Sequence, residues 1–290
     1  MNNYKVLVPP LKIQGIKTKL VPTIKQYVLI EKDTLWIEPF FGSGVVGFNI
    51  APSNAIFADI NPHIINFYQQ IQDGMITPYI VRDFLENEGS KLAKRDSEYY
   101  LEVRERFNEK HSALDFLFLN RSCFNGMMRF NKENKFNVPY CHKRERFSKA
   151  YVTKIVNQVA NVEALIKRNN WCFICQSFEK TIASATSNSF IYCDPPYIGR
   201  HVDYYNSWDE ESEKNLCKSL RQSNVNFMVS TWDKTAYRNN EYIEKVWSGC
   251  YKITKKHFYH VGAKENNRNT VIEALLLNYS PEKLLYKIEN

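Results

Sequence analysis

The stretch TLWIEPFFGSGVVGFNIAPSNAIFADINP, residues 34–62, decides the fold class. A β-rich run leads through a glycine turn into VVGFNIA, which can start a helix, and a second β-rich run, 54–60, carries an acid at its end. Apolar residues at helical spacing then follow Asn61, a candidate N-cap, and Pro62, at the first helical position. Strand alternating with helix predicts a parallel α/β sheet.

The rest of the chain interrupts this pattern and then resumes it. Residues 75–148 are polar and charged, mostly helical or irregular, and without clear buried strands. The alternation returns with a helix at about 149–168, strands near 171–176, 189–193, 226–231 and 270–279, and a helix near 207–222. We therefore expect one α/β domain, residues 1–74 and 149–290, that is interrupted by a basic insertion at 75–148.

Length and composition place the chain among globular proteins. With 290 residues, 44% hydrophobic and 24% charged, it can bury a sizeable core. No apolar run approaches the roughly 20 residues needed to cross a bilayer, so we expect no membrane association. The first residues, MNNYKVLVPPLK, lack the apolar core and cleavage site of a signal peptide, and we expect a cytoplasmic protein.

The basic balance of the chain favours a polyanionic partner. The net charge is +8, and runs of Lys and Arg interleaved with aromatic residues occur between residues 91 and 154. Such a distribution is typical of a surface that contacts nucleic-acid phosphates. Solvated helix faces, balanced by the neighbouring glutamates, are the alternative interpretation.

Two residue pairs have a spacing that could suit a metal. Cys172 and Cys175 are such a pair among seven scattered cysteines, but no second pair lies at zinc-ribbon distance. The surrounding residues indicate a buried strand, so we expect free core thiols in a reducing compartment. His257 and His260 lack an evident third ligand, and a strand and loop beside DNA is the favoured interpretation there. We expect no metal site.

The glycine turn and two acids indicate a nucleoside ligand. GSGVVG, residues 42–47, satisfies the dinucleotide fingerprint literally, so a nicotinamide dinucleotide is one candidate. Glu38 lies four residues before Gly42, where an anion suits a positively charged ligand better than a pyrophosphate. Asp59 ends the second strand and could accept both hydroxyls of a ribose. S-adenosylmethionine combines a ribose and an adenine with a sulfonium and an ammonium, and it carries no phosphate.

A rigid corner, SFIYCDPPYIGRH at residues 189–201, ends a later strand. The side chain of Asp194 and the carbonyl of Pro195 can both accept from an exocyclic amine and hold it for in-line attack. Prolines donate no backbone hydrogen bond, so the corner presents acceptors only. Tyr197 offers a flat face on which a flipped base can stack. A purely structural Pro-Pro turn is the alternative.

Together these segments carry a family resemblance. EPFFGSG, FADIN and YCDPPY, in that order and with a long insertion before the last, resemble the Dam-type, α-group adenine-specific DNA methyltransferases. PPLKIQGIKTKLVPTI and LNRSCFNGMMRFNKENKFNVPY (119–140) extend the resemblance over nearly the whole chain. The resemblance implies a Rossmann-like S-adenosylmethionine-dependent methyltransferase sheet with a helical DNA-recognition insertion. The implied reaction moves a methyl group to the 6-amino group of a flipped-out adenine in double-stranded DNA.

The resemblance also implies roles for the two parts of the chain and for its partners. Residues 1–74 and 149–290 become the catalytic and cofactor-binding domain, and 75–148 the target-recognition insertion. We expect a site-specific, monomeric enzyme of a restriction-modification system, with a cognate restriction endonuclease encoded nearby. The rival interpretations are a methyltransferase acting on RNA bases or glutamine, and a DNA-binding module without activity.

Carried over by position, the family's site residues fall into three groups. The cofactor residues are Lys17, Glu38, Phe41, Gly42, Gly44, Asp59, Phe178 and Asp194. The catalytic residues are Asp194, Pro195, Pro196 and Tyr197. The DNA-binding residues are Arg121, Phe124, Asn125, Met127, Arg129 and Pro139. Arg129 is the candidate for a bidentate contact to guanine, and Phe124 or Met127 for a wedge in the gap left by the flipped base.

Departures from the family pattern leave the recognition sequence open between GATC and other GA-containing sites. Ile13 and Ile16 replace a tryptophan and a glycine of the N-terminal motif, so that part of the cofactor wall must differ. Cys141 replaces the glycine after FNVPY, and HKRERFSK also differs from the Dam version. Residues 230–232, in STWDK, follow a strand and either shape the target-base pocket or simply end the strand.

Overall fold

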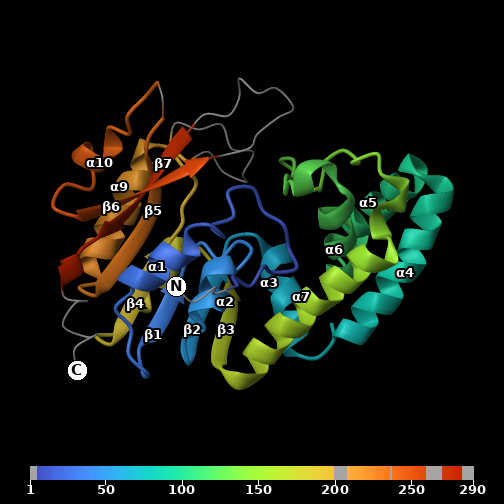
Figure 1. Cartoon of the computed structure of the whole chain (residues 1–290), viewed down its shortest axis with the longest axis horizontal. Coiled ribbons are helices and arrows are strands. Elements are labelled where there is room, and N and C mark those ends of the chain that lie inside the picture. The colour runs from blue at the N-terminus through green and yellow to red at the C-terminus, as the bar shows by residue number, and fades with distance from the viewer. Residues whose placement is uncertain (1–4, 199–207, 236, 259–269, 283–290) are drawn as a thin grey trace.

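A seven-stranded sheet in the order β3-β2-β1-β4-β5-β7-β6 forms the centre of the protein (Figure 1). The structure is a computed structural model that describes residues 5–198, 208–235, 237–258 and 270–282. The strands are β1 (Leu35–Glu38), β2 (Asn54–Asp59), β3 (Asn170–Cys175), β4 (Ser189–Cys193), β5 (Asn226–Lys234), β6 (Tyr251–Phe258) and β7 (Thr270–Leu277). Strands β1 to β5 run parallel, which confirms the predicted α/β sheet, whereas β7 is antiparallel to both β5 and β6.

Both faces of the sheet are buried. Successive residues of one strand point to opposite faces, and they enter two different apolar clusters. Trp36 of β1 and Phe190 of β4 belong to one cluster, and their neighbours Ile37 and Ile191 belong to the other. Burial on two faces explains why these strands read as continuous apolar runs in the sequence.

Helices connect the parallel strands. They are α2 (Val45–Ile50), α3 (Pro62–Gln72), α7 (Lys149–Arg168), α8 (Phe178–Ala183) and α9 (Glu210–Gln222). Two further helices are α1 (Val21–Tyr27), which precedes β1, and α10 (Tyr242–Lys245), which lies between β5 and β6. The predicted cap of α3 is confirmed, because the Asn61 side chain accepts from the backbone N–H of His63 at 3.0 Å.

The insertion forms a helical lobe beside the sheet, next to α3 and α7 (Figure 1). Its elements are α4 (Pro78–Arg95), α5 (Ser97–Lys110) and α6 (Ala113–Ser122), with 3₁₀ turns at Phe124–Gly126 and Arg144–Phe147. One apolar cluster runs from Trp36 in the sheet to Phe107 and Phe147 in the lobe. The lobe therefore packs through a shared core, and the predicted boundaries at 75 and 148 stay an interpretation.

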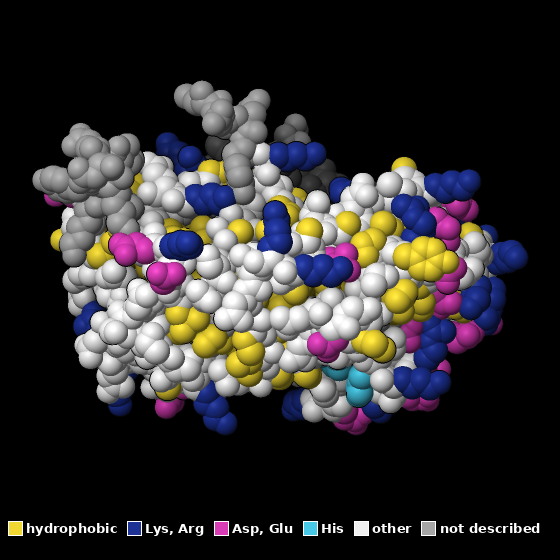
Figure 2. Space-filling view, turned by 90° about the horizontal axis from the view of Figure 1, so that it is seen from below, with side chains coloured by type: hydrophobic (Ala, Val, Ile, Leu, Met, Phe, Trp, Pro, Cys, Tyr) yellow, Lys and Arg dark blue, Asp and Glu magenta, His cyan; other side chains and the backbone are white. Residues whose placement is uncertain are grey.

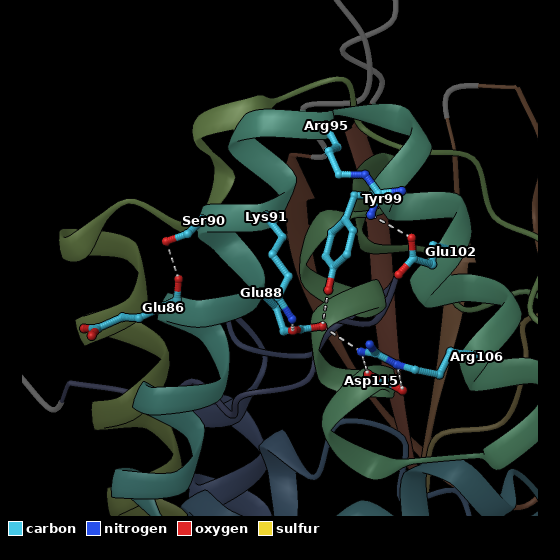
Figure 3. Close-up of polar contacts among 9 residues, drawn as sticks. All are labelled: Glu86, Glu88, Ser90, Lys91, Arg95, Tyr99, Glu102, Arg106 and Asp115. Carbon is cyan, nitrogen blue, oxygen red and sulfur yellow. Dashed lines mark hydrogen bonds and ion pairs between the residues drawn. The ribbon is translucent and has the colours of Figure 1, made fainter.

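An ion network around two buried acids joins the three insertion helices (Figure 3). Arg106 on α5 pairs with Glu88 on α4 at 2.7 Å and also with Asp115 on α6. Lys91 and Tyr99 donate to Glu88 at 2.8 and 2.7 Å. Because α6 leads directly into the predicted DNA-reading segment, this network helps to fix where that segment begins.

The cysteines at metal-like spacing are free, but they do not lie in the core. Cys172 and Cys175 are both exposed, whereas Trp171 and Phe173 on the same strand are buried. The prediction of core thiols is wrong for this pair because β3 is an edge strand with one open face, and Cys175 stands at its end.

The described residues contain neither a cluster of metal ligands nor a helix that could span a membrane. Within 5–198, 208–235, 237–258 and 270–282, no three His, Cys, Asp or Glu side chains gather as a metal site would require. His260, which the sequence predicts to lie beside DNA, is outside these ranges. None of the described helices combines the length and the apolar content of a membrane span.

Candidate active site

Three acids lie together at the carboxyl ends of the parallel strands, and this boundary is called the active-site edge of the sheet. Glu38 ends β1, Asp59 ends β2, and Asp194 follows directly after β4. Strand β1 pairs in parallel with both β2 and β4, so the carboxyl ends of three neighbouring strands lie together. In open α/β sheets ligands bind in the crevice outside such strand ends. The topology thus brings together three of the residues predicted from the sequence.

Asp59 ties the glycine turn to the second strand. Its two carboxylate oxygens accept from the backbone N–H groups of Gly42, at 2.8 Å, and Asn61, at 2.9 Å. Each carboxylate oxygen retains a second lone pair, so Asp59 can also accept from the hydroxyls of a ribose. Burial raises the pKa of Asp59, and the backbone hydrogen bonds oppose that rise.

The glycine turn is shaped by close packing. Gly44 has a φ of +76°, and a Cβ there would lie 2.4 Å from the ring of Phe41. A side chain at position 44 would therefore displace that ring and strain the backbone. Ile13 Cδ1 lies 3.3 Å from where a Cβ of Gly42 would be, so the residue that replaces the family's tryptophan borders this turn.

Glu38 is a carboxylate in the interior of the site. It is 2% exposed, and Trp36 Nε1 donates to it at 3.0 Å. Burial raises the pKa of Glu38 well above its ordinary value, the hydrogen bond from Trp36 opposes the rise, and the negative charge of Asp194 adds to it. A cationic ligand beside Glu38 would favour its ionised form.

Asp194 is held by Lys17 from the N-terminal segment. Lys17 Nζ lies 3.0 Å from Asp194 Oδ1, donates to the carbonyl of Gly15 at 2.8 Å, and stands 4.8 Å from the ring centroid of Tyr197. Burial raises the pKa of Asp194 to about 6, Lys17 lowers it, and Glu273 raises it. The acid of the corner is therefore ionised near neutral pH and sensitive to the charges around it.

Phe178 begins α8 and joins an aromatic group beside the same edge. Its ring centroid lies 5.5 Å from that of Phe40, just after β1, and 5.7 Å from that of Trp208. Phe178 is half-buried, so part of its surface is open to a ligand. Packing of Phe178 on a cofactor adenine stays a prediction.

Two residues from neighbouring strands form hydrogen bonds with the corner that follows β4. Glu273 on β7 accepts from the Tyr197 hydroxyl at 3.1 Å, and Trp232 Nε1 on β5 donates to the carbonyl of Ile198 at 3.1 Å. Trp232 belongs to the STWDK segment that the sequence left between two interpretations. Glu273 is not among the residues predicted from the sequence, although a lone acid within the apolar run VIEALLL is a signal that could reveal it.

The predicted DNA-reading residues, Arg121 excepted, lie on the segment that follows α6. Exposed or half-buried side chains there are Phe124, Asn125, Met127, Arg129 and Pro139. Phe124 is 50% exposed, and its backbone N–H donates to the carbonyl of Pro139 at 2.8 Å. Arg129 Nε donates to Asn137 Oδ1 at 2.9 Å. A large apolar side chain and a guanidinium are thus presented from one internally braced segment.

Arg121 has a different environment. It is 2% exposed, and its guanidinium donates to the carbonyl of Pro10 at 2.6 Å and to Gln158 Oε1 at 2.5 Å. These bonds tie α6 to the N-terminal segment and to α7. The placement gives a direct DNA contact by Arg121 no support, because its donors are engaged inside the protein.

The charged helices of the insertion carry many ion pairs. On the face drawn in Figure 2, Lys and Arg side chains lie intermixed with Asp and Glu over the insertion lobe. Arg95 pairs with Glu98 at 2.9 Å and with Glu102 at 2.8 Å, and Arg82 pairs with Glu86 at 3.4 Å. For α4 and α5, the alternative interpretation of solvated faces balanced by glutamates is therefore well supported.

The residues at the sheet edge fit S-adenosylmethionine better than a dinucleotide. Burial raises the pKa of the carboxyl groups of Glu38, Asp59 and Asp194. A pyrophosphate would add negative charge beside these acids and disfavour their ionised forms further. A ligand with a sulfonium, an ammonium and a ribose would find acceptors and negative charge at the same place. The donor set therefore suits a cationic nucleoside.

Comparisons with known proteins agree with this chemistry. A family model described as D12 class N6 adenine-specific DNA methyltransferase matches residues 14–287. The chain is 29% identical to the type II methyltransferase M1.LlaDCHI of Lactococcus lactis subsp. cremoris, over 93% of this chain and 95% of the relative. It is 35% identical to a DNA adenine methylase of Vibrio cholerae, over 92% and 94% of the two chains.

A solved structure was also found at greater distance. The rRNA methyltransferase AviRa from Streptomyces viridochromogenes is similar over 99% of this chain and 95% of its own, with 9% identity and a TM-score of 0.40. At this level the likeness carries no argument about function.

Proposed function

The chain belongs to the D12 class of N6 adenine-specific DNA methyltransferases, and we propose that Asp194, Pro195, Pro196 and Tyr197 form its catalytic corner. Its acceptor is thus adenine in DNA, and the family takes the methyl group from S-adenosylmethionine. The observation that carries the proposal is the convergence of Asp194 with Glu38 and Asp59 at the ends of neighbouring parallel strands.

The corner acts on the amino group by orientation and charge. The N6 lone pair is delocalised into the adenine ring, which makes the amine a weak nucleophile. The Asp194 carboxylate and the Pro195 carbonyl accept its two N–H groups, orient N6 for in-line attack and favour a tetrahedral nitrogen. Asp194 also stabilises the positive charge that grows on N6. Tyr197 stacks on the flipped base, and Pro196 keeps the corner rigid.

The cofactor is proposed to lie over the glycine turn. The residues assigned to it are Lys17, Glu38, Phe41, Gly42, Gly44, Asp59, Phe178 and Asp194. Asp59 would accept from the ribose hydroxyls, Glu38 would face the cationic methionine end, and Phe178 would pack on the adenine. When bound, S-adenosylmethionine supplies the electrophilic methyl group.

The test of the catalytic corner is Asp194→Ala. With labelled S-adenosylmethionine and duplex DNA, we expect transfer to fall by about 100-fold or more, with DNA binding retained. Asp73→Ala, an exposed acid at the end of α3, is the matched control and should transfer normally. Full methylation by Asp194→Ala would contradict the mechanism. Transfer to RNA or protein rather than to duplex DNA by the wild type would contradict the acceptor.

Sequence recognition is assigned to the segment after α6. We propose that Arg129 reads a guanine and that Phe124 or Met127 fills the gap left by the flipped adenine. Pro139 and Asn125 complete the DNA-facing residues of this segment. The proposal is supported by the exposure of this segment and by its likeness to the family motif. GATC or another GA-containing site is the proposed target.

Arg129→Ala is expected to relax specificity rather than to abolish activity. One bidentate contact to guanine is worth about 1–3 kcal/mol of discrimination, so methylation of sites altered at one base pair should rise relative to the cognate site. Rates on a panel of duplexes with single substitutions measure this. A uniform fall on every duplex would instead assign Arg129 to backbone contact.

We further propose that the enzyme protects DNA against a partner endonuclease. The relative from Lactococcus lactis is named a type II methyltransferase, whereas the relative from Vibrio cholerae is named a DNA adenine methylase. An extract of the source cells should cleave unmethylated DNA at the recognised sequence and spare DNA that this enzyme has methylated. An extract that treats both DNAs alike would favour a methylase that acts alone.

A further inference from the structure

We propose that Glu273 is a positioning residue of the adenine site, which holds the Tyr197 ring and, together with Trp232, fixes the corner that presents Asp194. The inference rests on the proposed roles of Asp194 and Tyr197. It adds a residue from β7, which lies two strands away from β4 in the sheet. Neither the family resemblance nor the sequence motifs assign Glu273 a role.

The surroundings of Glu273 make a carboxylate there unexpected. It lies in the middle of β7, within the run TVIEALLL, and is 1% exposed. Its neighbours on the strand, Ala274, Leu275 and Leu276, are fully buried. A carboxylate in such a place costs stability unless polar partners compensate for its lost hydration. The placement of Glu273 at the active-site edge therefore calls for a reason beyond packing.

The contacts of the corner supply that reason. Tyr197 donates its hydroxyl to Glu273 Oε1 at 3.1 Å, and Trp232 donates to the carbonyl of the next residue, Ile198, at 3.1 Å. Glu273 and Trp232 face each other in the register of β7 and β5. Two adjacent strands thus hold two consecutive residues of the corner, one by a side chain and one by the backbone.

The Tyr197 ring is constrained on its edge and on one face. Rotation about the bond that carries a tyrosine ring is only weakly restricted by its own torsional energy, so an external partner must fix the ring plane. Glu273 binds the hydroxyl, and Lys17 Nζ stands 4.8 Å from the ring centroid. Stacking of a flipped base requires a ring of fixed orientation, and Glu273 provides it.

Glu273 also contributes charge to Asp194. Burial is the main influence on the Asp194 pKa, Lys17 lowers that pKa, and Glu273 raises it. Glu38, on β1, is a further acid that interacts with Asp194. Loss of the Glu273 charge should therefore lower the pKa of Asp194, while Lys17 and Glu38 remain in place.

Glu273→Gln and Glu273→Ala separate the two effects. The amide oxygen of glutamine can still accept from Tyr197, so Glu273→Gln should keep most of kcat but move the acid limb of its pH profile to lower pH. Glu273→Ala should show the same shift and also lose about 10–100-fold in kcat, because the base is misplaced. Both rates are measured in single turnovers with saturating S-adenosylmethionine and a duplex that carries the recognised site.

A fluorescent base reports on the ring directly. The duplex carries 2-aminopurine at the target position. When this base is flipped out and bound, its emission should be low in the wild type and in Glu273→Gln, because stacking on Tyr197 quenches it. Its emission should be higher in Glu273→Ala, where the stacking is weaker. Tyr197→Phe keeps the ring and removes the donor. If Glu273 acts through Tyr197, combining Tyr197→Phe with Glu273→Ala should lower kcat no further than the worse single variant.

Glu213→Gln is the matched control. Glu213 is also a buried acid, 2% exposed, and it accepts from the indoles of Trp208 and Trp247 at 2.6 and 2.7 Å. The control should leave the pH profile and the 2-aminopurine signal unchanged. An unmoved acid limb in Glu273→Gln, or additive losses in the double variant, would overturn the inference.

The controls also separate this inference from the proposed function. If Asp194→Ala methylates normally, the catalytic corner itself is wrong. If Asp194→Ala is inactive while both Glu273 variants behave as the wild type, only the positioning role of Glu273 fails. Thermal unfolding of each variant shows whether a loss of rate reflects a loss of fold.

Discussion

Asp194 and Lys17 show how single residues set the working state of the site. Burial raises the pKa of the Asp194 carboxylate, and Lys17, at 3.0 Å, opposes that rise. An ionised carboxylate accepts from an amine more strongly than a neutral group does, and it stabilises the positive charge that develops on N6 in the transition state. Lys17 therefore helps to keep the Asp194 carboxylate ionised although that carboxylate is largely removed from water.

We predict an acid limb near pH 6 in kcat/KM for S-adenosylmethionine, which reports the enzyme before the cofactor binds. In the proposed mechanism Asp194 accepts in its ionised form, and its pKa is about 6, so kcat/KM should fall as the pH falls through that value. Lys17→Met removes the charge that lowers this pKa, so the limb should move to higher pH. The pH dependence of kcat/KM for S-adenosylmethionine measures the shift. A limb that stays in place or moves to lower pH would contradict the role given to Lys17.

The N-terminal segment is an element that connects the two lobes. The Asn49 side chain exchanges hydrogen bonds with the backbone of Leu7 at 2.9 and 2.8 Å, and the Asn120 side chain does the same with Lys12 at 2.8 and 2.8 Å. Between these two clamps, Arg121 binds the carbonyl of Pro10. The segment that carries Lys17 is thus fastened to α2, which follows β1 of the sheet, and to α6 in the insertion.

Arg121→Ala should act on stability first. Truncation leaves buried acceptors without their donor, and we expect a loss of about 2 kcal/mol in the free energy of unfolding. Urea unfolding measures this loss. Arg129→Ala, at a half-buried residue of the segment proposed to read DNA, should cost less than about 1 kcal/mol. Unchanged stability of Arg121→Ala together with weaker DNA binding would instead favour the DNA contact predicted from the sequence.

The ion network of the insertion should be visible in stability at low pH. Burial raises the pKa of Glu88, but hydrogen bonds from Lys91, Arg106 and Tyr99 outweigh it and leave the pKa below its ordinary value of 4.5. The stability that Glu88 contributes is therefore fully present above pH 4.5 and is lost as the pH falls through the lowered value.

Arg106→Ala tests the same network. Its removal leaves Glu88 and Asp115 as buried charges without their shared partner, and we expect a loss of about 3 kcal/mol in the free energy of unfolding. Arg82→Ala breaks an exposed pair with Glu86 and should cost less than about 1 kcal/mol. Equal losses of unfolding free energy in the two variants would refute the role of Arg106 in holding the three helices together.

At the scale of the whole molecule, the sequence predicts the site residues that stand at the ends of parallel strands. It does not predict site residues whose position depends on the order of strands in the sheet. Glu38 and Asp59 end their strands and Asp194 directly follows one, and parallel strands bring such ends together. Glu273 reaches the same site from β7, which is antiparallel and lies two strands away from β4. Local sequence does not encode that adjacency.

The order of the strands and the packing of the lobe also explain two differences from expectation. Cys172 is exposed because β3 is the last strand on one side of the sheet, which its apolar neighbours do not reveal. Arg121 lies in a segment that resembles a DNA-reading motif, yet its partners Pro10 and Gln158 come from distant parts of the chain. The charge of a residue alone does not distinguish a phosphate contact from an internal tie.

The most direct measurement is the position of methyl groups in DNA from a methylase-free host that expresses this chain. Sequencing that detects N6-methyladenine should find one GA-containing sequence almost fully methylated with the wild-type chain, and no methylation with Asp194→Ala. Methylation that persists with Asp194→Ala, or methyl groups on atoms other than adenine N6, would contradict the central claim that this corner presents adenine N6 to the methyl donor.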